Sequence, residues 1–148
     1  MRPAGPAAAR MLADAPLLRQ AGGMGDEDKR ARIERFLEAT GVDEAAAHAI
    51  YHDDAVLEFP QSGERFEGVP NFREWRSRYP ADVSMSVRHL RGSGDLWVAE
   101  VSISYDGGPW QLGISILEFR DDKVARETIY VTEPWEAPEW RAPWRAAP

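Results

Sequence analysis

Glu127 is the acidic residue whose setting in the sequence best suits catalysis. It lies in the segment VARETIYV, where strand alternation turns it toward the same face as Ile129, and the predicted strand pairing adds Ile116. A carboxylate enclosed by apolar side chains loses solvation, which favours its protonated form and suits general acid or base catalysis. A second interpretation stays open, in which Glu127 pairs with Arg73 or Arg76 and only ties the sheet to a helix.

His89 is the second candidate for a catalytic role. A three-residue turn at Gly92, Ser93 and Gly94 would pair His89 with Trp97 and place it at the rim of the apolar face. The alternative is a two-residue turn, which would put Ser86, Arg88 and Leu90 on that face instead. On a flat sheet, strand spacings of about 4.8 Å would keep it about 14 Å from the column of Glu127. A curved sheet would bring the two groups face to face across a ligand. The alternative is a histidine at a strand end, on the surface.

Other kinds of site find little support in the sequence. The run His52-Asp53-Asp54 contains metal-ligand types, but consecutive residues rarely converge on one ion, and Asp after a helix commonly caps or forms a turn, so no metal site is predicted. There is no cysteine, which excludes thiolate catalysis and Cys-based zinc sites. Motifs for nucleophilic serine, phosphate loops, zinc proteases and dinucleotides are also missing. Any reaction is therefore expected to need no cofactor.

The composition indicates a single, soluble globular domain. The chain has 148 residues, of which 43% are hydrophobic and 29% are charged. Its net charge of −7 repels phosphate backbones, so nucleic acid is not an expected partner. Apolar runs are shorter than the roughly 18 residues of a membrane span, so we expect no membrane partner and a cytoplasmic location.

Periodicity predicts helices followed by a sheet. Helical patterns cover residues 26–39, 44–51 and 69–79, and a short strand at 56–59 is followed by a polar, charge-balanced loop. The second helix is rich in alanine, and His48 on it is expected to be exposed. Residues 83–132 alternate with period two and are predicted to form four antiparallel strands.

The predicted turns of this sheet decide which side chains share its apolar face. A two-residue turn at Gly107-Gly108 pairs Val101 with Ile114, and the turn Asp121-Asp122 then pairs Ile116 with Glu127. This face and the aromatic residues of the preceding elements are expected to line a pocket for a small hydrophobic molecule. The expected ligand-binding residues are Phe59, Trp75, Trp97, Ala99, Val101, Ile103, Leu112, Ile114, Ile116 and Ile129.

The two ends of the chain differ in composition from the domain, residues 26–132. Residues 1–25 are predicted to be a disordered tail, and Met24 is an alternative start. Residues 133–148 contain four prolines, which favour extended, polyproline-like structure. Trp135, Trp140 and Trp144 lie in this segment, and we expect these rings to dock as a strap on the domain or on a partner subunit.

The segment YHDDAVLEFPQSGERFEG, together with the strand-rich half after it, resembles the ketosteroid isomerase, SnoaL-like and scytalone dehydratase group. These proteins belong to the nuclear-transport-factor-two-like superfamily, and the resemblance covers roughly residues 32–131. It implies an α+β cone, in which a curved mixed or antiparallel sheet wraps around three N-terminal helices. Because members commonly dimerise, it also implies a homodimer.

The resemblance does not extend to ketosteroid isomerase activity. Phe59 stands where those enzymes have their catalytic base, Ile116 where they have the acid that stabilises the oxyanion, and the first helix contains no tyrosine. We expect a SnoaL-like domain that binds a hydrophobic or polycyclic molecule, with cofactor-free acid-base catalysis of isomerase, dehydratase or cyclase type. The alternative is a non-catalytic binding or dimerisation module whose pocket is filled by its own tryptophans.

Overall fold

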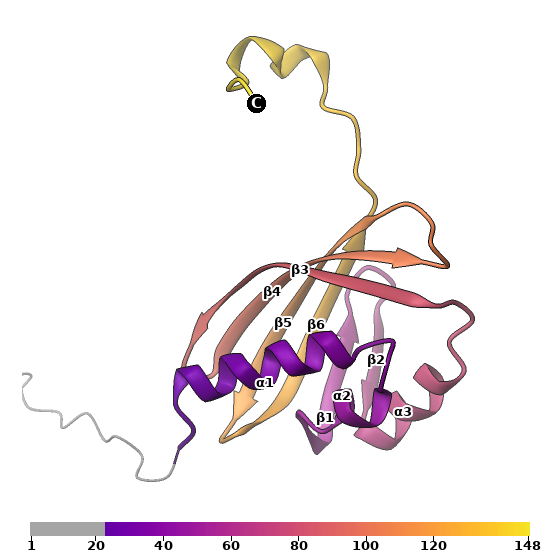
Figure 1. The fold of residues 1–148 in the computed structure, drawn as a ribbon, viewed down its shortest axis with the longest axis vertical. Coiled ribbons are helices and arrows are strands. Elements are labelled where there is room, and N and C mark those ends of the chain that lie inside the picture. Colours follow the sequence, from indigo (N-terminus) through magenta and orange to yellow (C-terminus); the bar gives the residue numbers. More distant parts are fainter. Residues whose placement is uncertain (1–22) are drawn as a thin grey trace, which may run out of the picture.

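The computed structural model describes residues 23–148, and the chain folds into helices packed on one curved sheet (Figure 1). The predicted tail at residues 1–25 lies almost wholly outside the described residues. The predicted α+β cone is confirmed, with the helices N-terminal and the sheet open rather than closed into a barrel. No helix within residues 23–148 is both long and apolar enough to cross a membrane.

The three helices lie where the sequence predicts them. α1 (Asp26–Ala39) has the predicted bounds, and the acidic residues in its first turn favour the positive end of the helix dipole. α3 (Val69–Ser77) has Pro70 in its first turn, a position where no amide hydrogen is needed. α2 (Glu44–His48) is shorter than predicted, because Tyr51 already belongs to the first strand.

Within residues 23–148, six strands form one mixed sheet in the order β2-β1-β6-β5-β4-β3. β1 runs parallel to β6, and every other neighbouring pair is antiparallel. The polar segment predicted as a loop contributes an edge strand, because it pairs with the second half of β1. The strands are β1 (Tyr51–Phe59), β2 (Glu64–Glu67), β3 (Val83–Ser93), β4 (Leu96–Tyr105), β5 (Gln111–Arg120) and β6 (Lys123–Thr132).

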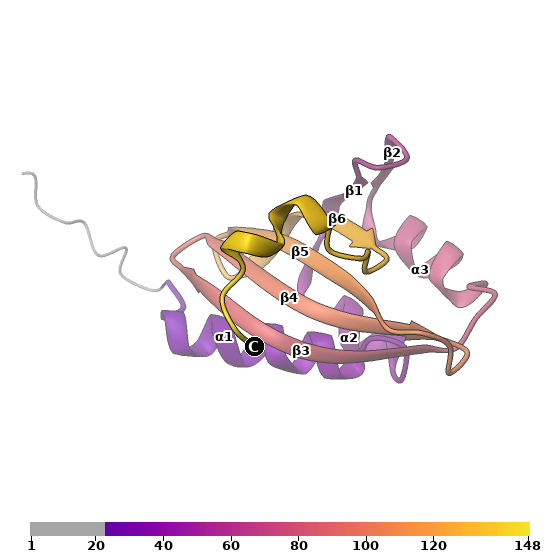
Figure 2. The same ribbon diagram turned by 90° about the horizontal axis from the view of Figure 1, so that it is seen from above.

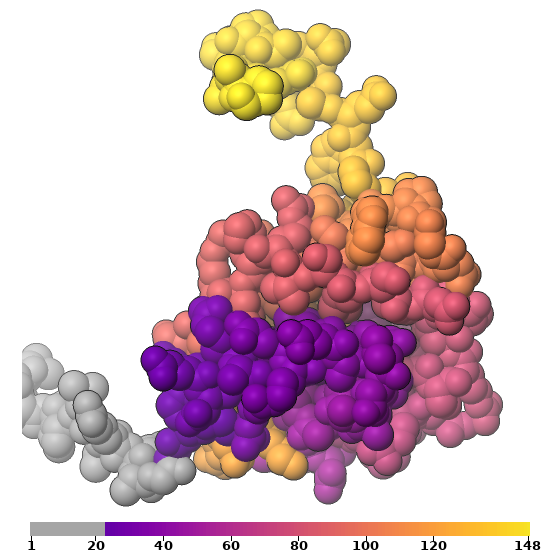
Figure 3. All heavy atoms as spheres, in the orientation of Figure 1, coloured from indigo at the N-terminus to yellow at the C-terminus, as the bar shows by residue number. Residues whose placement is uncertain are grey.

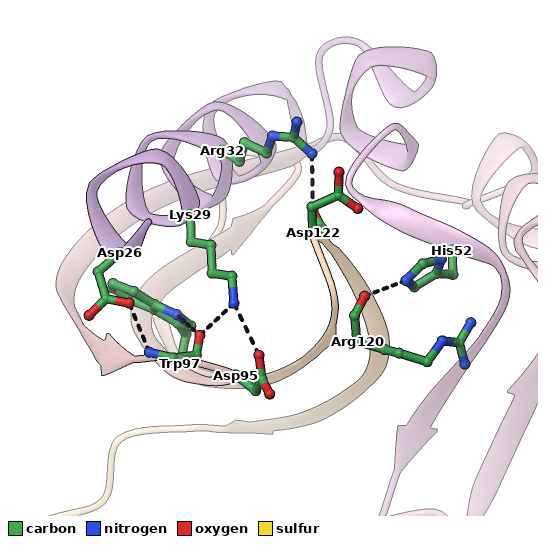
Figure 4. Close-up of polar contacts among 9 residues, drawn as sticks. Asp26, Lys29, Arg32, His52, Asp95, Trp97, Arg120 and Asp122 are labelled. Atoms are coloured by element: carbon green, nitrogen blue, oxygen red, sulfur yellow. Dashed lines mark hydrogen bonds and ion pairs between the residues drawn. The ribbon is translucent and has the colours of Figure 1, made fainter. Parts of the chain in front are cut away.

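The helices cover the inner, concave face of the sheet, and α1 lies across the strands (Figures 1 and 2). Side chains of α1 also reach the turns at one end of the sheet (Figure 4). Lys29 Nζ donates to Gly94 O at 2.9 Å and lies 3.1 Å from a carboxylate oxygen of Asp95, while Arg32 donates to Asp122 O at 3.0 Å. Since these acceptors sit in the β3–β4 and β5–β6 turns, α1 closes this end of the cone.

The predicted register of β5 is wrong by one residue. The turn before it is centred on Gly107 rather than between Gly107 and Gly108, so Val101 pairs with Gly113 and not with Ile114. Asp106 and Gly107 have φ angles of 51° and 69°, and Pro109 has no amide hydrogen to continue the ladder. Because a slip of one residue reverses every side chain of a strand, β5 presents its other face to the helices.

A bulge in β6 explains why the predicted orientation of Glu127 nevertheless holds. The turn at Asp121-Asp122 is confirmed, since Arg120 pairs with Lys123. The register then shifts between Phe119 and Glu118, so that Glu127 pairs with Leu117 on the inner face instead of with Ile116. The register differs from the prediction by one residue on each side of β5. The two differences cancel, so β6 keeps its predicted orientation.

The turn between β3 and β4 is also shorter than predicted. Ser93 pairs with Leu96, which leaves a two-residue turn, and the register shifts between Val87 and His89. His89 therefore pairs with Glu100 instead of Trp97, and its side chain lies exposed on the outer face of the sheet.

The C-terminal segment differs from the predicted extended conformation in one place. Residues Glu139–Trp144 form the 3₁₀ helix η1, while the flanking residues are extended. The segment leaves the end of β6 and stands clear of the domain (Figures 1 and 3). Trp135, Trp140 and Trp144 are 72–78% exposed, so the rings do not dock on their own domain as one of the two expectations had it.

Candidate functional site

A pocket of about 270 Å³ lies between the inner face of the sheet and the helices. Apolar and aromatic side chains form most of its wall. Four charged residues also line it: Glu44, Arg76, Asp82 and Glu127. Pockets of this kind, mostly apolar with a few polar groups, are typical of small-molecule sites. Its other lining residues include Phe36, Leu37, Phe59, Trp75, Tyr79, Met85, Val101, Ile103, Tyr105, Gly113, Ser115, Ile129 and Val131.

Part of the predicted set of ligand-binding residues lines this pocket. Phe59, Trp75, Val101, Ile103, Ile114 and Ile129 do so together with Glu127. Trp97, Ala99, Leu112, Ile116 and His89 do not. The reversed orientation of β5 explains why Leu112 and Ile116 do not line the pocket, because their side chains lie on the outer face of the sheet. Ile114 is also largely exposed on that face. Trp97 is only 1% exposed and donates from Nε1 to Gly94 O, at the closed end of the cone.

An aromatic row forms one wall of the pocket. Phe59, Phe66 and Tyr79 surround Trp75, with ring centroids 5.4–6.4 Å from it. Tyr79 continues the row to Tyr105, whose pKa is raised to about 12 by burial and by Tyr79. These rings present large apolar surfaces that carry polar groups only at their edges.

Gly113 lies in the opposite wall of the pocket and leaves space there because it has no side chain. A Cβ atom at this position would lie 2.8 Å from Ile103 Cδ1 and 2.9 Å from Val101 Cγ2. A side chain would therefore have to displace both neighbours. The sequence analysis missed this role, because the predicted register placed Ile114 here.

Glu127 lies at the inner end of the pocket and is 2% exposed. The Tyr51 hydroxyl donates a hydrogen bond to Oε2, and Ser115 Oγ donates to Oε1 at 2.7 Å. Burial and the charge of Glu127 raise the pKa of Tyr51 well above its usual range, so the phenol keeps its proton and remains a donor. The two hydroxyl groups thus hold both oxygens of the carboxylate in place.

Neither hydroxyl donor was predicted from the sequence. Tyr51 was assigned to the end of a helix, and the predicted pairing of Val101 with Ile114 turned Ser115 away from the face of Glu127. The strand alternation that located Glu127 would also have located Ser115, had the β4–β5 turn been assigned correctly. The run YHDDAVLEF begins with a β-favouring residue, which was the available signal that β1 starts at Tyr51.

Arg76 is the cation of the site. Its guanidinium lies 6.0 Å from the Tyr51 ring centroid, and its Nη1 donates to His48 Nε2 at 3.2 Å. Burial alone would lower the pKa of Arg76, but Tyr51 and Glu127 outweigh it, and the pKa is raised. None of the described residues forms an ion pair with Glu127 within 4.0 Å. Arg76 therefore interacts with Glu127 by electrostatic attraction at a distance and not by direct pairing.

His48 is the hydrogen-bond partner of Arg76. The sequence analysis expects it to be exposed, but it is buried, because the short helix α2 packs against α3. Burial and the charge of Arg76 lower the pKa of His48, so the ring is neutral and its Nε2 accepts the hydrogen bond.

The run His52-Asp53-Asp54 makes ordinary structural contacts. His52 Nε2 lies 2.6 Å from Arg120 O (Figure 4). Asp54 forms an ion pair with the Arg120 side chain at 2.7 Å. Within the part of the chain that the structure describes, no three His, Cys, Asp or Glu side chains gather in a way that would hold a metal ion.

The curved mixed sheet, with helices on its inner face and a pocket between them, defines the class of cone-shaped α+β domains. Residues 24–127 match the family model of the SnoaL-like domain. This chain therefore belongs to the SnoaL-like family. Its fold is the NTF2-like, ketosteroid isomerase-like fold that the sequence analysis predicts.

Solved structures agree with this assignment. The chain is 42% identical to an NTF-2 like protein of unknown function from Burkholderia xenovorans LB400, with a TM-score of 0.78, over 84% of this chain and 98% of that one. A putative ketosteroid isomerase from Kribbella flavida DSM 17836 is 24% identical, with a TM-score of 0.73, over 82% and 90% of the two chains. An LEH-like epoxide hydrolase of M. tuberculosis is 17% identical, with a TM-score of 0.62, over 72% and 84%. A comparison with curated proteins found no match.

Proposed function

We propose that this protein binds a small hydrophobic molecule in the pocket, and that Glu127 acts on it as a general acid-base group without a cofactor. The observation that carries this proposal is a buried carboxylate at the inner end of a pocket whose walls are otherwise largely apolar and aromatic. Structures named as a putative ketosteroid isomerase, a putative polyketide cyclase and an epoxide hydrolase share the fold and are in keeping with such a role.

The contacts of Glu127 suit a proton acceptor whose position is fixed. Tyr51 and Ser115 hold its two oxygens, and each oxygen keeps a further lone pair for a ligand. The carboxylate would take a proton from one atom of the ligand and return it to another, which regenerates the carboxylate. This cycle serves an isomerase, a dehydratase or a cyclase. His89, the predicted second group, is no part of the proposal, because it lies on the other face of the sheet.

Glu127→Gln tests the proposal because it keeps the shape of the side chain and removes its charge. Both proteins are titrated with a set of apolar fluorescent ligands at neutral pH. We expect the affinities of the natural protein and the variant to differ by about tenfold, because the variant no longer presents a carboxylate to the bound molecule. Glu118→Gln, which changes an outer-face acid, is the matched control and should behave as the natural protein. Absence of binding in both proteins, or the same affinity in both for every ligand, would overturn the proposal.

A second function, assembly with another copy of the chain, is favoured by two exposed apolar surfaces. Leu112, Ile114 and Tyr130 are 36–41% exposed on the outer face of the sheet, where Ile114 and Tyr130 are direct partners. The C-terminal segment carries the three exposed tryptophans away from the domain (Figure 3). None of these rings lines the pocket, so within one chain the pocket is not filled by them. We infer a homodimer in which the C-terminal segment of one copy covers the outer face of the other.

Removal of the residues after Glu133 tests this assembly. Sedimentation equilibrium should give a dimer for the full chain and a monomer, or a dimer at least tenfold weaker, for the truncated one. Tyr130→Lys, on the outer face, should weaken the dimer in the same way. An unchanged oligomeric state after truncation would show that the segment does not cover a second copy.

A further inference from the structure

Gly113 stands in the interior of a central strand, where glycine is an unfavourable residue. It pairs with Val101 on β4 and with Val131 on β6. Its φ angle lies outside the left-handed range, so the backbone conformation there is one that other residues adopt. Glycine weakens the interior of a strand relative to alanine, because it loses more freedom on folding and has no side chain to pack. The backbone conformation therefore does not explain this glycine, and the space around it has to.

Two side chains of β4 fill the space above Gly113. A Cβ atom at this position would lie 2.8 Å from Ile103 Cδ1 and 3.5 Å from Ile103 Cγ1, and 2.9 Å from Val101 Cγ2. Carbon atoms in contact are normally about 3.5–4.0 Å apart, so both side chains would have to move. Ile103 and Val101 are buried and line the pocket. Gly113 thus allows these two side chains to lie close to the sheet.

The pocket is the open side of Ile103. The backbone of the sheet lies behind this side chain, and Met85, its partner on β3, lies beside it and lines the pocket as well. A methyl group at position 113 would push Ile103 away from β5. Because the interior of a protein is closely packed, the side chain would move toward the empty space and make the pocket smaller.

The size of the pocket indicates the size of the ligand that needs this room. A cavity of about 150 Å³ binds benzene in another protein, and the pocket here has about 270 Å³, which is room for about two fused rings. Ser115 lies two residues after Gly113 and faces the same side of β5, and its Oγ donates to Glu127. The room that Gly113 provides is therefore next to the candidate acid-base group.

From these observations we propose that Gly113 determines the size of the ligand, because it lets Ile103 and Val101 lie close to the sheet and so gives the pocket room for about two fused rings. The proposal rests on the small-molecule binding proposed above and adds a residue that sets its specificity. Gly113 acts through its two neighbours and not on the reacting atoms, so it is a specificity-determining residue rather than a catalytic one.

Benzene and naphthalene are matched probes for this selection, since they differ by one fused ring. Their dissociation constants are measured by NMR titration for the natural protein and for Gly113→Ala. The readout is the ratio of the two constants, because a general loss of folded protein weakens both probes by the same factor and leaves the ratio unchanged. We expect Gly113→Ala to shift the ratio about tenfold against naphthalene, the usual effect of one misplaced methyl group in an apolar pocket.

Variants of Ile103 and Leu112 make the test specific. Gly113→Ala/Ile103→Val removes Cδ1, the atom that the new methyl group meets, and should shift the ratio back toward its natural value. Ile103→Val alone keeps Gly113 and enlarges the pocket at the same place, so it should favour naphthalene. Leu112→Ala is the matched control, because Leu112 lies on the outer face of the same strand, and it should leave the ratio unchanged.

Four outcomes would overturn the inference. If naphthalene binds and Gly113→Ala leaves the ratio unchanged, Gly113 does not set the size of the ligand, and the proposed function stands. If Gly113→Ala does not fold, an unchanged ratio in Ile103→Val has the same meaning. If benzene binds to the natural protein and naphthalene does not, the size is wrong, and small-molecule binding still stands. If neither probe binds to the natural protein, the inference fails together with small-molecule binding itself.

Discussion

Truncation of Trp97 to alanine is expected to lower the free energy of unfolding by about 3–5 kcal/mol, the usual cost of removing a buried aromatic side chain. Trp97 is 1% exposed, and Arg30 lies 5.3 Å from its ring centroid. Its Nε1 also satisfies Gly94 O in the turn that α1 covers (Figure 4). The alanine variant would leave a cavity at the closed end of the cone and loosen the contact between α1 and the sheet.

Urea unfolding followed by far-ultraviolet circular dichroism measures this change. Trp110→Ala is the control, because Trp110 is 52% exposed and its loss should change stability by no more than about 0.5 kcal/mol. The milder Trp97→Phe keeps enough of the fold for ligand titration, and its affinity for apolar ligands should equal that of the natural protein. A loss of affinity in Trp97→Phe, with stability unchanged, would return Trp97 to the ligand site that the sequence predicts.

The fold could be predicted because its signals are local and agree with one another. The acidic first turn of α1, Pro70 in α3 and the long period-two alternation after Val83 each indicate one element, and the order of these elements defines the cone. β2 escaped prediction because three of its four residues are charged and Phe66 is its one apolar side chain. An edge strand of this kind is specified by its partner β1 rather than by its own residues.

The site was only partly predictable, because register depends on turns and bulges that the alternation does not reveal. The turn before β5 and the bulge opposite Glu118 each shift the pairing by one residue, and both reverse β5 relative to its neighbours. Glu127 kept its predicted orientation, whereas Ile114 and Ser115 exchanged faces. Arg73 and Arg76 were the two alternatives for a partner of Glu127. The contact of Arg76 with His48 depends on the packing of α2 against α3, two elements with no shared pattern in the sequence.

The buried carboxylate of Glu127, on β6, is held by groups from two other strands, so its position depends on both of them. Tyr51 comes from β1 and Ser115 from β5. Phe36 and Phe72 pack edge-on against the Tyr51 ring, with centroids 5.7 Å and 5.4 Å from it, which fixes the phenol. The helices thus orient Glu127 through Tyr51, and the same contacts that build the core also position the candidate acid-base group.

Removal of the Tyr51 hydroxyl should therefore cost more than the loss of an ordinary hydrogen bond. Tyr51→Phe keeps the ring and leaves one oxygen of a buried carboxylate without its donor, for which we expect a loss of about 1.5–3 kcal/mol in urea unfolding at neutral pH. Tyr130→Phe, with an exposed hydroxyl on the outer face, should change stability by less than about 0.5 kcal/mol.

A double-mutant cycle separates this hydrogen bond from the packing of the ring. In the Glu127→Gln background the acceptor is neutral, so Tyr51→Phe should cost at least about 1 kcal/mol less than in the natural protein. Equal losses in the two backgrounds would mean that the phenol does not hold the carboxylate. If the coupling is found, the Tyr51 hydroxyl holds the carboxylate of Glu127 in place, and a ligand entering the pocket meets an acid-base group whose position is already fixed.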